Sequence, residues 1–178
     1  MHRKLMLVLF LGLPSVLCSQ TPRHIPSQAT ERIVREVRHQ LVMLPYLNVF
    51  DNITYTVDGY NVTLRGQVTN PTLKRDAGNV VKQIEGVENV DNQVEVLPPS
   101  TMDDGLRLRL YRAIYGYGPL EKYAMPVIKP IRIIVKNGHV ALEGVVDNQT
   151  DKDMAALRAN GVSGVFSVTN NLEVVKGK

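Results

Sequence analysis

The segment VKNGHVALEGVVDN, residues 135–148, places His139 beside a glutamate and two glycines, which could form a general base with an orienting carboxylate. General-base catalysis needs a titratable side chain and a positioned partner within hydrogen-bond reach. Moving back by 78 positions gives VDGYNVTLRGQVTN, residues 57–70, which has the same apolar skeleton. Asn61 stands there in place of His139, and an arginine stands in place of the glutamate. We therefore interpret His139 as a residue at the end of a hairpin.

No other group of residues has the spacing of a catalytic, metal or phosphate site. The histidines His2, His24 and His39 lack the spacing of metal ligands. Gly66 and Gly144 follow apolar strands, yet neither belongs to a G-x-G-x-x-G or P-loop pattern. We expect these two glycines to mark a bulge or a close contact between helix and sheet. The sequence thus predicts no catalytic residue, no metal, no cofactor and no enzyme activity.

The N-terminus has the composition of a secretory signal peptide. Arg3 and Lys4 precede an apolar run from Leu5 to Leu13. This run is shorter than the roughly 20 apolar residues of a spanning helix, and no later stretch is apolar enough to cross a bilayer. We therefore expect residues 1–19 to be a signal peptide and residues 20–28 a linker. The mature chain is expected to be exported, without a transmembrane span.

The single cysteine and the net charge both depend on this processing. Cleavage after Cys18 leaves neither disulfides nor thiolate metal sites. The alternative is acylation of Cys18, as in bacterial lipoproteins, although Leu17 precedes it where a small residue is preferred. The formal charge of +4 falls to +2 without Arg3 and Lys4, because the chain then has 19 basic and 17 acidic residues. This weak bias does not indicate a nucleic-acid binder, which would carry a concentrated basic face.

The 78-residue offset continues without a gap from the hairpin to the end of each copy. Positions that coincide include Val62, Leu64, Gly66, Val68, Gly86, Val87, Val90 and Asn92 with Val140, Leu142, Gly144, Val146, Gly164, Val165, Val168 and Asn170. A period this long fits a small domain and is too long for a solenoid repeat. We expect two tandem domains, residues 29–97 and 103–176. Two prolines in residues 98–102 predict a short, stiff linker.

Within each copy the hydrophobic period predicts the order helix, strand, strand, helix, strand. Residues 53–57 and 61–68 alternate apolar and polar around an Asp-Gly turn, which is typical of a hairpin. Asn70-Pro71 supplies an N-cap and a first helical residue. We expect Gly86 and Gly164 to end the second helix of each copy in a left-handed conformation.

The first helix of each copy is predicted less directly. In the first copy Ile33, Val34, Val37 and Leu41 share one helical face, which stops at Pro45. In the second copy residues 106–110 alternate like a strand, but their place in the repeat favours a helix. Residues 115–119, Tyr-Gly-Tyr-Gly-Pro, have no visible counterpart and are interpreted as an insertion. The expected fold class is α+β: two tandem small α/β sandwiches, each with two helices on one face of a three-stranded mixed sheet.

The repeated pattern resembles the BON domain of bacterial envelope proteins. The resemblance rests on V-x-L-x-G-x-V, then a helix, then G-V-x-x-V-x-N-x-[LV]-x-V, at residues 62–68 with 86–96 and at residues 140–146 with 164–174. It implies a periplasmic or envelope protein, similar to osmotically inducible dual-BON proteins and dual-BON outer-membrane lipoproteins. Some of these bind anionic phospholipid and support envelope integrity. The family's lipid contacts lie around the first helix of the second domain, without a fixed motif.

That region contains a cluster of arginines and tyrosines, from which we select Arg107, Arg109, Arg112, Tyr115 and Tyr117 as candidate lipid-binding residues. Aromatic rings with polar tips beside guanidinium groups suit a phospholipid headgroup layer. The alternative is that the tyrosines pack in the core or between the domains. The other function class that the sequence leaves open is an adaptor that binds an envelope protein through exposed sheet edges or the tyrosine-rich segment. Arg32, Arg35 and Arg38 on the earlier helix are interpreted as a solvated face.

Overall fold

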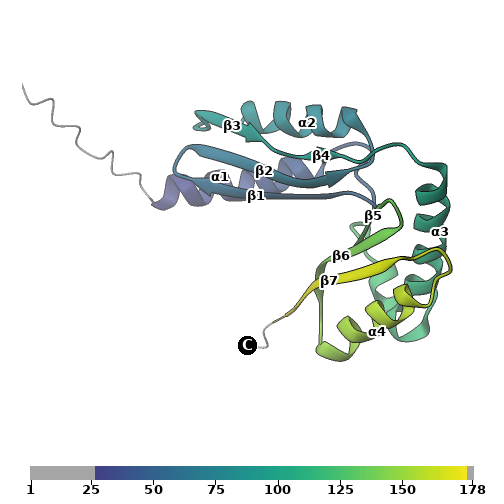
Figure 1. The fold of residues 1–178 in the computed structure, drawn as a ribbon. Helices are drawn as coiled ribbons and strands as arrows, with labels where there is room; N and C mark the ends of the chain where they lie inside the picture. The colour runs from purple at the N-terminus through teal and green to yellow at the C-terminus, as the bar shows by residue number, and fades with distance from the viewer. Residues whose placement is uncertain (1–26, 176–178) are drawn as a thin grey trace, which may run out of the picture.

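The computed structural model describes residues 27–175, so the expected signal peptide, Cys18 and most of the N-terminal linker lie outside the described residues. Two sheets with their own helices form two units that lie at an angle to each other (Figure 1). The expected α+β class is confirmed, and so is the order of helices and strands in each unit. No helix within residues 27–175 is long and apolar enough to cross a membrane.

The first unit has a short third strand that is broken in two. Its elements are α1 (Ser27–Val42), β1 (Asn52–Asp58), β2 (Asn61–Val68), α2 (Pro71–Lys82), β3 (Asn89–Asn92) and β4 (Glu95–Val96). Strand β2 is central, with β1 antiparallel on one side and β3 and β4 parallel on the other. The break follows Asn92, whose side chain turns away to donate to the carbonyl of Lys74 at 2.7 Å.

The second unit repeats this arrangement with one extra short helix. Its elements are α3 (Thr101–Tyr115), the 3-10 helix η1 (Gly118–Ala124), β5 (Ile131–Lys136), β6 (His139–Val146), α4 (Gln149–Asn160) and β7 (Ser167–Val174). Strand β6 is central between antiparallel β5 and parallel β7. Residues 106–110 are helical, which confirms the choice that the repeat favoured over the strand-like alternation.

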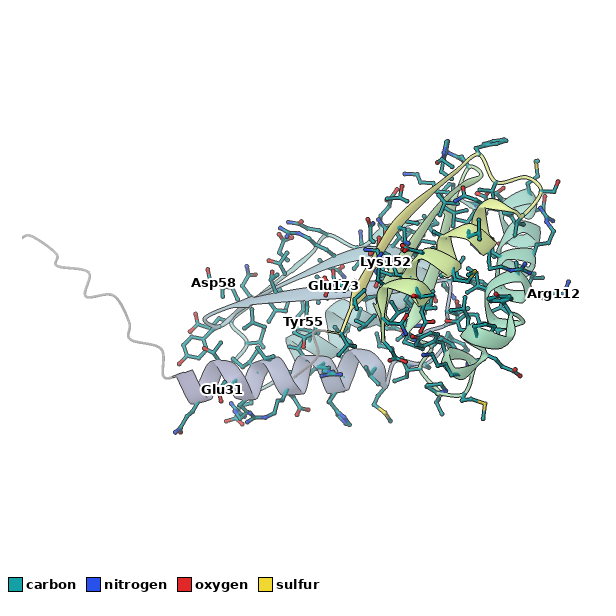
Figure 2. All side chains as sticks on the ribbon, turned by 90° about the horizontal axis from the view of Figure 1, so that it is seen from below. Glu31, Tyr55, Asp58, Arg112, Lys152 and Glu173 are labelled. Carbon is teal, nitrogen blue, oxygen red and sulfur yellow. The ribbon has the colours of Figure 1, made fainter. Side chains whose placement is uncertain are left out.

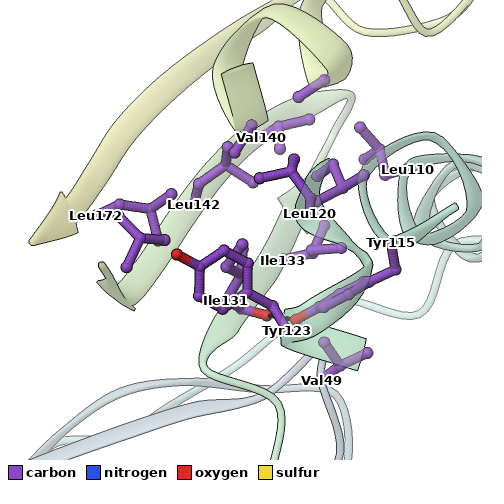
Figure 3. Close-up of a cluster of buried hydrophobic side chains, with 14 of the residues drawn as sticks. Val49, Leu110, Tyr115, Leu120, Tyr123, Ile131, Ile133, Val140, Leu142 and Leu172 are labelled. Carbon is purple, nitrogen blue, oxygen red and sulfur yellow. Dashed lines mark hydrogen bonds between the residues drawn. The ribbon is translucent and has the colours of Figure 1, made fainter. Parts of the chain in front are cut away.

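Each unit buries its own apolar core between helices and sheet. In α1, Ile33, Val37 and Leu41 face the sheet as expected, whereas Val34 is 38% exposed. The core of the second unit contains one residue from outside it. Val49, in the loop between α1 and β1, packs beside Tyr115 and Ile131 (Figure 3). The first unit therefore completes the core of the second.

Gly66 and Gly144 are both held in a close backbone contact across the hairpin. Their φ angles are +118° and +112°, and a Cβ atom would lie 2.0 Å from the carbonyl oxygen of Asn52 and 1.9 Å from that of Pro130. The close approach is between two strands, rather than between helix and sheet. Only glycine fits there because any side chain would collide with backbone that cannot move away.

Gly86 and Gly164 have the predicted positive φ, +91° and +93°. Their expected role as helix ends is wrong. Helix α2 ends at Lys82 and α4 ends at Asn160, each followed by a cap residue with right-handed backbone. The two glycines instead turn the chain a few residues later, on the way to the third strand.

Candidate functional site

The position of each candidate lipid-binding residue around helix α3 determines whether its side chain reaches the surface. It begins after Ser100, whose Oγ accepts the N–H of Asp103 at 3.2 Å. It buries Leu106, Leu110 and Ile114 at helical spacing against the sheet. A helix turns by about 100° per residue, so each neighbouring position points in a different direction. Arg107 falls within the buried stripe, whereas Arg109 and Arg112 face solvent.

Arg107 lies inside the second unit. It is only 4% exposed. Its Nη1 donates to the Asp104 carboxylate at 2.5 Å, and its Nη2 donates to the carbonyl of Val135 in β5 at 2.7 Å. The guanidinium therefore ties α3 to the sheet and does not reach a membrane surface.

Tyr115 is also enclosed in the core. Its hydroxyl donates to the carbonyl of Ile131 at 2.5 Å, and burial raises the pKa of the phenol above its ordinary value. Tyr117 is different, because it is half-buried and the guanidinium of Arg158 lies 5.0 Å from its ring centre. Of the five candidates, Arg109, Arg112 and Tyr117 are at or near the surface, and Arg107 and Tyr115 are not.

Two arginines connect α3 with α4 and with the turn that follows α4. Arg109 Nη2 donates to the carbonyl of Ser163 at 3.4 Å, and Arg158 Nε donates to the carbonyl of Ala113 at 3.1 Å. From Arg109 to Ala113 along α3, the hydrogen-bond partners go from Ser163 back to Arg158. The two helices therefore run antiparallel. A hollow of about 350 Å³ lies between them, lined by Ala113, Tyr117, Met154, Leu157, Arg158 and Val162.

The exposed side of this helix pair combines leucines with arginines. Leu108 is 52% exposed and Leu157 is 64% exposed. Figure 2 shows Arg112 at the outer end of the second unit, pointing away from the ribbon. We call this region the α3–α4 surface, defined by Leu108, Arg109, Arg112, Tyr117, Leu157 and Arg158. Sequence reasoning missed Leu108, Leu157 and Arg158.

Comparison with equivalent positions of the first unit shows which residues of the α3–α4 surface occur only in the second unit. Arg32 donates to the carbonyl of Glu85 at 3.0 Å, as Arg109 does to that of Ser163. Glu85 and Ser163 are 78 positions apart, so Arg109 is the counterpart of Arg32, and the first helices match at an offset of 77.

This alignment identifies the replaced surface residues. Leu108 stands where the first unit has Glu31, and Leu157 stands where it has Asn79. Arg112 has Arg35 as its counterpart. The signal was present in the sequence as apolar replacements at exposed repeat positions.

The same alignment corrects the interpretation of residues 115–119 as an insertion. The offset is 77 in the first helix and 78 in the hairpin, so the second copy has only one additional residue between them. Helix α1 continues to Val42, whereas α3 ends at Tyr115. The segment therefore replaces the last turn of the helix and leads into η1.

Polar groups elsewhere in the second unit have structural partners. His139 Nδ1 lies 2.7 Å from Ser167 Oγ at the exposed hairpin end. Lys122 Nζ contacts the carboxylates of Asp147 and Asp151 at 2.7 and 2.8 Å, which links η1 to the start of α4. Within residues 27–175 no group of three or more His, Cys, Asp or Glu side chains could hold a metal ion.

Comparison with known proteins matches one domain family. The BON domain family matches residues 29–98 and 122–176. No curated protein matches this chain. Among solved structures, it is similar to CdsD, a structural protein of the type III secretion system of Chlamydia trachomatis, at 14% identity and a TM-score of 0.31, covering 83% of this chain and 94% of that one. The C-terminal domain of CdsD is similar at 12% identity and a TM-score of 0.29, covering 81% and 98%.

Proposed function

Since this chain belongs to the BON domain family, we propose that it is a non-enzymatic, exported module of the bacterial envelope that binds anionic phospholipid. The binding region is the α3–α4 surface of the second unit. In this role the protein is periplasmic, contacts the membrane from its surface, and supports envelope integrity or the response to envelope stress.

The observation that carries the proposal is the pairing of exposed leucines with arginines on one surface. Leu108 and Leu157 occupy positions where the first unit has a glutamate and an asparagine. Exposed apolar side chains beside basic groups suit a bilayer interface, where leucine enters the acyl boundary and guanidinium pairs with phosphate. Each basic residue near an anionic surface contributes about 1 kcal/mol.

The buried candidates have a supporting role in this proposal. Arg107 and Tyr115 hold α3 against β5 through the carbonyls of Val135 and Ile131. They position the helix without touching lipid. Arg109, Arg112 and Tyr117 stay in the proposed contact set.

Liposome flotation tests the proposal with variants taken from the repeat itself. Leu108→Glu and Leu157→Asn give the second unit the residues of the first at exposed positions, so the fold should be retained. We expect the parent to float with vesicles that contain phosphatidylglycerol and the double variant to stay in the soluble fraction. Asn79→Leu in the first unit is the control, and this variant should float with the vesicles as the parent does.

Equal binding to phosphatidylcholine and phosphatidylglycerol vesicles, or binding to neither, would overturn the lipid proposal. The adaptor function would then be the better account. Unchanged flotation of the double variant would remove the α3–α4 surface from the proposal.

A further inference from the structure

The loop between α1 and β1 docks on the second unit. The carbonyl of Val49 accepts the N–H of Ile133 at 2.9 Å, and the Val49 side chain is buried in the second core (Figure 3). The ring of Phe50 meets that of Tyr111 edge to face, with 6.5 Å between centroids. An apolar pair from one unit thus covers the outer edge of β5 in the next.

The equivalent loop of the second unit is exposed. At an offset of 78, Val49 and Phe50 correspond to Val127 and Ile128. Val127 is 97% exposed and Ile128 is also exposed. Lys129 Nζ donates to the carbonyl of Pro126 at 2.7 Å, and this hydrogen bond spans the loop.

The loop of the first unit has a hydrogen bond between the equivalent positions. There the N–H of Asn48 donates to the Asp51 carboxylate at 3.1 Å, between the two positions equivalent to Pro126 and Lys129. Both loops therefore present their apolar pair from a closed turn.

The first unit carries the surface on which such a loop would dock. The counterparts of Ile133 and Tyr111 are Tyr55 and Val34. Tyr55 lies on β1, which pairs only with β2 among the described strands, and its hydroxyl donates to the carbonyl of Val34 at 3.1 Å. Val34 lines an open hollow of about 610 Å³ with Thr30, Glu31 and Arg35.

We propose that the Val127–Ile128 loop of one chain docks on the β1 edge and the Val34 hollow of a second copy. The contact repeats between chains the one that joins the two units within a chain. It uses different surfaces on the two partners, so it continues head to tail and either closes into a ring or extends as a filament. This inference does not depend on lipid binding.

Sedimentation velocity of the mature chain tests the proposal. Contacts across a short linker experience an effective concentration of order millimolar, so the measurement extends to about 1 mM protein. We expect concentration-dependent association of the parent. Val127→Asp places a charge in the docking loop, and Val34→Glu places one in the hollow on which the loop docks. Each variant should therefore be monomeric.

Mixing the two variants gives a sharper result. Each retains one intact surface, so an equimolar mixture should form dimers and nothing larger. Phe166→Asp, at an exposed position outside both surfaces, is the control and should associate like the parent. Circular dichroism melting checks that each variant is folded, and Val34→Gln replaces Val34→Glu if that variant is not.

A monomeric parent at about 1 mM would overturn the proposal. So would association of Val127→Asp equal to that of the parent, or a mixture of the two variants that stays monomeric.

Discussion

Asn170 Nδ2 donates a hydrogen bond of 2.9 Å to the carbonyl of Lys152, which ties β7 to the first turn of α4. Its Oδ1 also accepts the N–H of Leu172 at 3.3 Å. Asn92 makes the same pair of bonds in the first unit, to Lys74 and Val94. The repeated asparagine therefore satisfies backbone groups of a helix and a strand at once.

Asn170→Ala should destabilise the protein by about 1–3 kcal/mol, because it leaves two part-buried backbone groups without their partner. Urea denaturation measures the change. Asn171→Ala, at an exposed neighbour, is the control and should stay within about 0.5 kcal/mol of the parent. Equal losses for both variants would contradict the role of Asn170.

Gly144→Ala should be more damaging than Gly164→Ala. A Cβ atom at Gly144 would collide with the carbonyl of Pro130, whereas at Gly164 the nearest atom is the end of the flexible Arg109 side chain. The positive φ alone costs about 1 kcal/mol. Thermal melting should rank Gly118→Ala, Gly164→Ala and Gly144→Ala in order of increasing loss, since nothing lies within 4 Å of a Cβ at Gly118.

Acid should weaken the contact between η1 and α4. Burial alone would raise the pKa of Asp151, but hydrogen bonds from Lys122 and Tyr123 outweigh it and lower the pKa below its ordinary value. The carboxylate therefore stabilises the fold above the unfolded pKa of about 3.9, and this contribution is lost as pH falls through the folded pKa. Denaturation of the parent and of Asp151→Asn should differ at about pH 6, and the difference should shrink as pH falls below the unfolded pKa of about 3.9. A constant difference across this range would contradict the assignment.

Salt should weaken lipid binding through Arg112. Interactions with an anionic surface are screened over roughly 8–10 Å at ordinary ionic strength. Arg112→Gln should reduce flotation with anionic vesicles and lessen its dependence on salt. Arg35→Gln, at the equivalent position of the first unit, is the matched control and should bind like the parent.

The repeat made the strands, the hairpins and the positive-φ glycines predictable, because each signal was present twice. Arg107 was expected at the surface, but its side chain is buried, and the reason is physical. Its spacing from Leu110 and Ile114 puts it on the buried stripe of α3, but arginine is normally expected at the surface. The docking of Val49 could not be predicted, since it depends on how two units pack and not on the period within either one.

Val49 makes the two copies of the duplication unequal. A second unit separated from the first would lack one valine side chain from its core, and burial of such a side chain is worth about 1.5–3 kcal/mol. Recombination that moved the second copy alone would therefore transfer an incomplete core, whereas the pair can be inherited as one piece.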